Sequence, residues 1–213
     1  MGDNGCSVLA YAITAIWLIA YTVWFKQKLF YNIVMVKSKY LLVPATLAHR
    51  DWIMEQIDGC RPLMAKHNSG QWQGHEPSVA TIEKDIYYQR FYLLLENEQP
   101  CGGAALLNHE PAYDSLLEGH WLNAEAYMVI HRFFIAPSFQ GRHLSKMLLA
   151  QLEHRIEQYQ MRNVRLDTHA LNQPMRGLLA RLQYSQVGRA WIANAGERLV
   201  YHKVLGEKHG TQK

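Results

Sequence analysis

The hydrophobic pattern after residue 35 changes repeatedly between runs typical of strands and runs typical of helices. Short apolar or alternating runs, rich in β-branched and aromatic residues, indicate strands. We expect seven of them, at 39–45, twice within 90–110 around a turn at 97–100, and at 127–136, 163–170, 185–192 and 197–205. The two strands of 90–110 form an antiparallel hairpin in this interpretation.

Apolar residues spaced three and four positions apart predict the helices. The first such region, 47–67, contains Gly59 and Pro62, and we expect these two residues to divide it into two helices. Further helices are expected at 79–89, 144–159 and 172–182.

The helix at 144–159 has one apolar stripe, which indicates the face that packs on a sheet. The stripe consists of Leu144, Leu148, Leu152, Ile156 and Tyr159. A strand, this helix and a second strand follow one another between residues 127 and 170, so we expect a right-handed crossover with parallel strands. Together with the hairpin, this predicts a mixed α/β (α+β) fold, with a mostly antiparallel sheet flanked by helices and one parallel crossover.

The first 34 residues differ from the rest of the chain. Residues 4–25 carry no charge, and the apolar run within them has about the length of a membrane-spanning helix. Two interpretations remain open: 8–24 is a membrane anchor that leaves the following domain in the cytoplasm, or translation begins at Met35. We therefore expect an N-terminal extension at 1–34, one domain at 35–206, and a polar tail at 207–213.

Composition narrows the class of protein. Hydrophobic residues make up 49% and charged residues 19% of the chain, as in ordered globular domains. The net charge is +4, but the basic residues are scattered, which argues against nucleic acid as a partner. Cys6, Cys60 and Cys101 are far apart and match no metal-site spacing, so we expect free thiols, no bound metal and a cytoplasmic location.

The stretch PSFQGRHLSKM, residues 137–147, joins a strand to a helix in the way that anion sites often do. The first turn of a helix has unsatisfied N–H groups and a partial positive charge, which suit a phosphate. Arg142 and Lys146 add two formal charges. An ordinary strand-to-helix turn with a solvated rim is the alternative.

HRFFIAPSFQGRHLSKMLL resembles the central motif of the GCN5-related N-acetyltransferases (GNAT), in which a Gln/Arg-x-x-Gly-x-Gly/Ala turn precedes a helix. Gln140 occupies the first position of that turn, while His143 and Ser145 stand where the family usually has small residues. SGQW (69–72) is similar to an acceptor-side loop of bacterial members, and VRLDTHALNQPM (164–175) to a later stretch. The resemblance covers about residues 36–205.

The resemblance implies that the chain binds acetyl-CoA as a co-substrate. In the family, loop amides hold the pyrophosphate and the preceding strand pairs with the pantetheine arm. The implied cofactor-binding residues are Phe133, Phe134, Ile135, Gln140, Gly141, Arg142, His143, Leu144, Ser145 and Asn172. Asn172 is also a plain helix N-cap, and the two roles are compatible. Because the main chain does the binding, only a positive φ or a close approach demands glycine, and His tolerates a left-handed backbone better than most residues.

The implied reaction is direct attack of an amine on the acetyl thioester, which needs a base near the amine. His131 is the first candidate, with a hydrogen-bonded structural histidine as the alternative. Glu125, Asp167 and His169 compete for the role. Strand alternation places His131, Phe133 and Ile135 on one face.

One frequent family feature is absent, a tyrosine near Leu179 that protonates the thiolate. Tyr127 or water is left as the proton donor. The acceptor is expected to be an amine of a small molecule or peptide, selected by the Gln71–Trp72 loop, the connector 110–125 and the last two strands. Three functions remain: an N-acetyltransferase, an acyl-CoA-binding relative without turnover, and a membrane-anchored scaffold. A homodimer is compatible with each.

Overall fold

The computed structural model describes residues 39–66, 70–74 and 76–206. The chain divides into two compact units, Met1–Leu41 and Leu42–Lys213, and the second is described below. The expected anchor at 8–24 and the polar tail at 207–213 lie outside the described residues. Within the described residues, every helix is too short or too polar to cross a bilayer.

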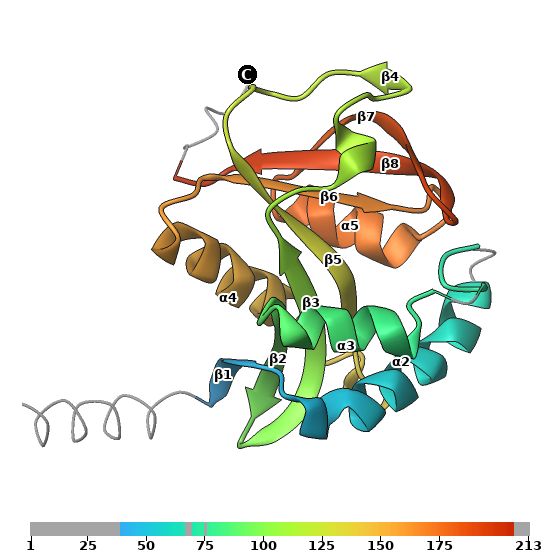
Figure 1. Cartoon of the computed structure of the whole chain (residues 1–213), viewed down its shortest axis with the longest axis vertical. Helices are drawn as coiled ribbons and strands as arrows, with labels where there is room; N and C mark the ends of the chain where they lie inside the picture. Colours follow the sequence, from blue (N-terminus) through green and yellow to red (C-terminus); the bar gives the residue numbers. More distant parts are fainter. Residues whose placement is uncertain (1–38, 67–69, 75, 207–213) are drawn as a thin grey trace, which may run out of the picture. The chain divides into compact units, whose positions relative to one another are not determined.

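Strands and helices alternate along the chain much as the hydrophobic pattern predicts (Figure 1). The elements are β1 (Tyr40–Pro44), η1 (Leu47–His49), α2 (Arg50–Ala65), α3 (Val79–Tyr87), β2 (Phe91–Glu96), β3 (Gln99–Leu107), η2 (Pro111–Tyr113), β4 (Glu118–Gly119), β5 (Tyr127–Ile135), η3 (Pro137–Phe139), α4 (Leu144–Gln158), β6 (Asn163–Thr168), α5 (Gln173–Arg181), β7 (Ser185–Ile192) and β8 (Gly196–Val204).

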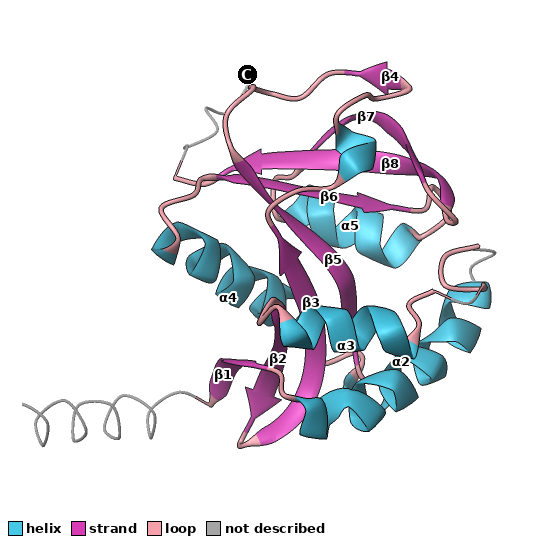
Figure 2. Cartoon of the chain, viewed as in Figure 1, coloured by secondary structure: helices cyan, strands magenta, loops and turns pink. Residues whose placement is uncertain are grey.

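The strands form one mixed sheet of eight strands in the order β1-β2-β3-β5-β6-β8-β7-β4 (Figure 2). Within the described residues, β5 and β6 form a parallel pair that α4 connects, which confirms the expected crossover. The predicted hairpin is confirmed as well, because β2 and β3 pair antiparallel. Its turn residues Asn97 and Glu98 both have positive φ, the backbone geometry that suits the twist of a two-residue hairpin. The mixed, mostly antiparallel fold class is thereby confirmed.

Helices pack on both faces of this sheet. On one face, Ile53 and Ile57 of α2 and Ile82 of α3 are fully buried against β2, β3 and β5. On the other face, α4 contacts β3 and β5 through its apolar stripe. Four of the five stripe residues are buried as predicted, whereas Tyr159, just beyond the helix, is half exposed. The crossover helix therefore begins at the carboxyl end of β5.

The prediction of two helices between 47 and 67 is wrong, because α2 runs unbroken from Arg50 to Ala65. Pro62 lies near its end, where the missing N–H removes only one helical hydrogen bond. Gly59 lies inside the unbroken helix, at its contact with η3. A Cβ at Gly59 would lie 3.0 Å from Cγ of Pro137, so the glycine lets α2 approach the loop that precedes α4.

Candidate active site

The sheet opens between β5 and β6. These strands pair only from Tyr127–Asn163 to Val129–Arg165, whereas β5 stays paired with β3 as far as Ile135. No described strand pairs with the second half of β5 on the side that faces β6. A strand edge with open N–H and C=O groups readily accepts another extended chain.

A β-bulge at Arg132 accompanies this opening. Two residues of β5, Arg132 and Phe133, lie opposite the single Ala104 of β3, and Arg132 has a φ of 53°. A bulge bends its strand and increases the local twist, which directs β5 away from β6.

The bulge makes the predicted alternation along β5 wrong. His131 and Arg132 both lie on the face covered by α2 and α3, where Arg132 contacts Asp85 of α3. Phe133 and Ile135 line a pocket beside α4 instead. His131 therefore does not share a face with Phe133, because one extra residue separates the two halves of the strand.

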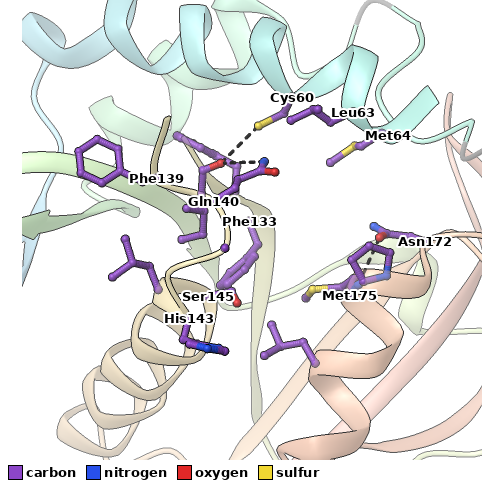
Figure 3. Close-up of a pocket in the computed structure, with 16 residues that line it drawn as sticks. Cys60, Leu63, Met64, Phe133, Phe139, Gln140, His143, Ser145, Asn172 and Met175 are labelled. Atoms are coloured by element: carbon purple, nitrogen blue, oxygen red, sulfur yellow. Dashed lines mark hydrogen bonds between the residues drawn. The ribbon is translucent and has the colours of Figure 1, made fainter. Parts of the chain in front are cut away.

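The first pocket lies where β5 has left β6, and its volume is about 290 Å³ (Figure 3). Its walls come from the C-terminal half of α2, the end of β5, the loop before α4, and the start of α5. Nine of the ten residues implied for cofactor binding line it: Phe133, Phe134, Ile135, Gln140, Gly141, His143, Leu144, Ser145 and Asn172. One sequence motif and one distant residue, Asn172, are thus brought together.

The loop before α4 contains two left-handed residues next to the start of the helix. Gly141 has a φ of 77° and His143 a φ of 59°, so the glycine and the histidine both adopt left-handed conformations. His143 occupies the N-cap position, but no side chain caps the helix there. The N–H groups of the first turn therefore point out of the helix end toward the pocket rim.

Arg142, the tenth implied residue, does not line this pocket, and its guanidinium pairs with Glu96. Its Nη2 donates to both carboxylate oxygens of Glu96, at 2.8 and 2.6 Å, and Glu96 is 5% exposed. The guanidinium also lies over the ring of Phe139. Glu96 offsets the formal charge of Arg142, so a positive charge from Arg142 at this loop stays a prediction, and Lys146 in the first turn is exposed.

A second pocket of about 430 Å³ adjoins the first. All three segments expected to select the acceptor contribute to it, namely the Gln71–Trp72 loop, the connector through Glu110, and the end of β7 with Arg198 of β8. Of the two tryptophans considered for an acceptor pocket, Trp72 lines it. Trp121 instead packs against Tyr113 and donates to its carbonyl oxygen.

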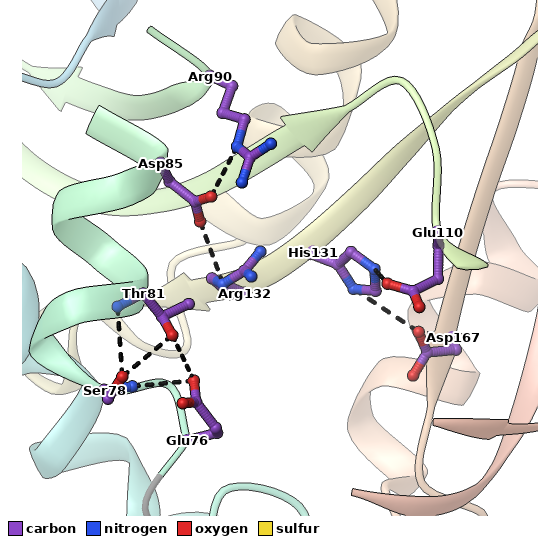
Figure 4. Close-up of polar contacts among 9 residues, drawn as sticks. All are labelled: Glu76, Ser78, Thr81, Asp85, Arg90, Glu110, His131, Arg132 and Asp167. Carbon is purple, nitrogen blue, oxygen red and sulfur yellow. Dashed lines mark hydrogen bonds and ion pairs between the residues drawn. The ribbon is translucent and has the colours of Figure 1, made fainter. Parts of the chain in front are cut away.

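His131 faces this second pocket between two carboxylates (Figure 4). Its Nε2 lies 3.1 Å from Glu110 Oε2, and its Nδ1 lies 3.6 Å from Asp167 Oδ2. The hydrogen bond with His131 is the main reason that the pKa of Glu110 lies below its ordinary value. Tyr113 donates to Asp167 at 2.8 Å, and burial raises the pKa of this phenol well above its usual range. Two hydrogen-bonded pairs, His131 with Glu110 and Tyr113 with Asp167, thus meet at the 3.6 Å contact between His131 and Asp167 and form one polar cluster.

The other candidates for proton transfer lie apart from this cluster. Glu125 is exposed beyond the opposite end of β5, where it accepts a hydrogen bond from Asn163. Tyr127 begins β5 and stacks on the guanidinium of Arg165 at 3.8 Å. Neither residue lines either pocket. His169 lies beyond β6, and its Nδ1 accepts from the backbone of Leu171.

The position of the frequent family tyrosine is apolar, as the sequence indicates. Leu178 and Leu179 of α5 are 6% and 0% exposed and belong to the core face of the helix. The following Tyr184 donates to Glu153 at 2.8 Å, and its burial raises its pKa well above the usual range.

Side chains of Arg61 and Gln71 hold the Gln71–Trp72 loop in place. Arg61 of α2 donates to the backbone carbonyl oxygens of Trp72 and Gly74. Gln71 Oε1 accepts from Thr168 at 3.1 Å and from the side chain of Asn172 at 3.1 Å. Asn172 Oδ1 caps α5 at the N–H of residue 175. The two carboxamides therefore connect the loop of the second pocket to the wall of the first.

Sequence reasoning did not identify Arg61 as a site residue, and it named Glu110 only as the first residue of the connector 110–125, without its link to His131. Glu110 follows a strand and precedes a proline, a pattern that many loop carboxylates share. Its proximity to His131 arises from the pairing of β3 with β5. Within the described residues, no cluster of side chains is suited to hold a metal ion.

Comparison with known proteins identifies the family of this chain. The model of the acetyltransferase (GNAT) family matches residues 55–184. A GNAT-family acetyltransferase structure from Streptococcus agalactiae is 32% identical, covers 79% of this chain and 96% of its own, and superposes with a TM-score of 0.72.

Two further structures share the fold at lower identity. An acetyltransferase from Salmonella typhimurium that modifies the N-terminal serine of ribosomal protein L7/L12 is 16% identical, with a TM-score of 0.58 and coverage of 80% and 97% of the two chains. The PaiA N-acetyltransferase from Thermoplasma acidophilum, solved with coenzyme A, is 12% identical, with a TM-score of 0.57 and coverage of 78% and 99%. A search of curated proteins gave no match. The chain belongs to the GNAT family of acetyltransferases.

Proposed function

We propose that this protein transfers the acetyl group of acetyl-CoA to a primary amine of a small molecule or peptide by direct attack. One observation carries the proposal. The pocket at the open edge of β5 adjoins a second pocket that contains the His131 cluster, so a thioester in the first would face an amine in the second.

The first pocket fits acetyl-CoA in three respects. The amides of residues 140–145, arranged by the positive φ of Gly141 and His143, suit the pyrophosphate. The open edge of β5 suits the amide-bearing pantetheine arm, as an added strand. The apolar side chains of Leu63 on α2 and Leu178 on α5 suit the aliphatic part of that arm. Because His143 is exposed at the helix start, its imidazole can turn toward solvent when the pyrophosphate enters.

In this mechanism His131 removes the proton from the attacking amine. When Nε2 donates to Glu110, the lone pair of Nδ1 is free to accept a proton directly or through one water. Glu110 then stabilises the charged imidazolium, and Asp167, fixed by Tyr113, lies 3.6 Å from Nδ1. This arrangement is compatible with both the structural and the catalytic interpretation of His131.

Acetyl-CoA supplies an activated acetyl thioester whose thiol is the leaving group. Backbone N–H groups of β5 beyond the bulge are the donors for the carbonyl oxygen, because they lie at the open edge. Water in the open groove is the proton source for the thiol. Tyr127 lies at the opposite end of β5, and the side chains at Leu178 and Leu179 are apolar.

Calorimetric titration with acetyl-CoA tests the cofactor half of the proposal. We expect micromolar binding that is abolished in Gly141→Pro, because proline excludes a positive φ, and in Ser145→Glu, because a carboxylate enters the helix start. Ser138→Glu is the matched control, since Ser138 is exposed and lies outside the pocket, and it should bind normally. Normal binding by both pocket variants would place the pyrophosphate elsewhere.

Thiol release across a panel of amines and peptides tests the transfer half. Turnover should appear with at least one amine and fall about 10²- to 10⁴-fold in His131→Gln, the usual contribution of a positioned base. Acetyl-CoA binding should stay unchanged in that variant. Binding without thiol release for any amine would instead support an acyl-CoA-binding protein without turnover.

A further inference from the structure

The two pockets share a wall of four residues. Met64 of α2, Phe133 of β5, Asn172 before α5 and Met175 of α5 line both pockets. Three of these side chains are apolar, and they come from three separate elements. If the proposed function holds, the acyl group lies at this wall when it passes from thioester to amine.

The two methionines have room to adjust. Met64 and Met175 are both partly exposed, and Figure 3 shows them on different walls of the same pocket, from α2 and α5. Methionine has three rotatable bonds and a polarisable sulfur, so it fills irregular space and yields to a larger neighbour. Asn172, by contrast, is fixed by the N-cap of α5 and by Gln71.

The surface around the methionines is also apolar. Leu178, one turn beyond Met175, extends the apolar wall on α5, and Leu63 does so beside Met64 on α2. A polar hydroxyl at this part of α5 would disfavour methylene groups, because a buried hydroxyl needs a hydrogen-bond partner. In this chain, an acyl group with a longer aliphatic part would contact methionine side chains that can move and leucine side chains that exclude water.

We propose that Met64 and Met175 determine the length of the acyl group that this enzyme accepts. The inference rests on the proposed function. Shortening either methionine to alanine makes space at the wall for additional methylenes of the acyl chain. The donors affected are short saturated acyl-CoA thioesters, such as propionyl-CoA and butyryl-CoA.

The test compares the Kd of CoA, acetyl-CoA and butyryl-CoA by calorimetry, which requires no knowledge of the acceptor. Butyryl carries two more methylenes than acetyl, and burying each contributes about 0.8 kcal/mol, so the ratio of the two Kd values should shift up to ~15-fold toward butyryl-CoA. We expect this shift in Met64→Ala and in Met175→Ala, with the Kd of CoA unchanged. Met175→Leu, which keeps the volume, should preserve the wild-type ratio.

Met161→Ala is the control, because Met161 is partly exposed and lies outside both pockets. An unchanged ratio in both pocket variants, with acetyl-CoA still bound, would overturn this inference and leave the proposed function standing. An equal loss of affinity for CoA itself would also overturn it, since the methionines would then contact the pantetheine arm. Failure of the wild-type protein to bind any of the three ligands would overturn the proposed function as well.

Discussion

Protonation of His202 should set the acid stability of this domain. His202 lies in β8 and is 0% exposed. Its Nδ1 accepts from the N–H of Leu122 at 3.1 Å, and its Nε2 lies 3.0 Å from Asn163 Oδ1. Both nitrogens of the neutral ring therefore have a hydrogen-bond partner. Burial, assisted by the positive charge of Arg165, lowers the pKa of His202 to about 4.

The direction of the pH dependence follows from proton binding in the folded and unfolded states. In the unfolded chain the ring titrates near its ordinary pKa of about 6.5, so below that pH the unfolded state binds the extra proton. The stabilising contribution of the neutral ring is therefore complete above about pH 6.5 and is lost as the pH falls toward 4. Between pH 7 and pH 5 the loss amounts to about 2 kcal/mol.

The assay is urea unfolding at half-unit steps between pH 7 and pH 5, for the wild type and for His202→Gln. Glutamine keeps one donor and one acceptor and does not titrate. The stability difference between wild type and variant should shrink by about 2 kcal/mol across this range. His154→Gln, at an exposed position of α4, should show no such change. A difference for His202→Gln that stays constant with pH would refute the reasoning.

Three further predictions concern contacts that support the site and the edge strand β4. Asp85→Asn leaves the partly buried Arg132 without its carboxylate, so it should lower the free energy of unfolding by about 3–5 kcal/mol in urea titrations. Asp51→Asn, at an exposed ion pair, should have little effect, and equal effects of the two variants would contradict this prediction. Gln71→Leu should destabilise the protein by about 1–3 kcal/mol in the same assay, and Gln71→Glu, which keeps the accepting oxygen, should cost less than half as much. Equal losses would show that the hydrogen bonds to this oxygen do not hold the loop. Gly188→Ala, whose Cβ would lie 2.1 Å from a carbonyl oxygen of β4, should detach that strand and speed its amide exchange; unchanged protection would refute the contact.

Local physics made most of the fold predictable. The apolar stripe of α4, the hairpin turn at Asn97 and the crossover all follow from short-range periodicity and turn chemistry. The tolerance of His143 for a left-handed backbone was also foreseeable, because it is a property of one residue. The loop before α4 could therefore be interpreted from the sequence alone.

The features that were missed depend on contacts between distant segments. Gly59 looks like a helix breaker until Pro137 is seen packed against it. Arg142 looks like a free charge until the hairpin brings Glu96 to it. Glu110 becomes a hydrogen-bond partner of His131 only because the β3–β5 register places the two side chains next to each other. No local pattern encodes these pairings, so the polar partners of the site could not be predicted.

The bulge at Arg132 has a consequence for how this fold tolerates change. Because β5 carries one residue more than β3 at this point, deleting Arg132 would restore a regular ladder and leave His131 and Phe133 on the faces that they already occupy. The straightened strand could then continue its pairing with β6 past Val129 and close the groove. The capacity of the sheet to admit a ligand chain would thus depend on a single surplus residue, and therefore on strand length more than on the chemistry of any side chain.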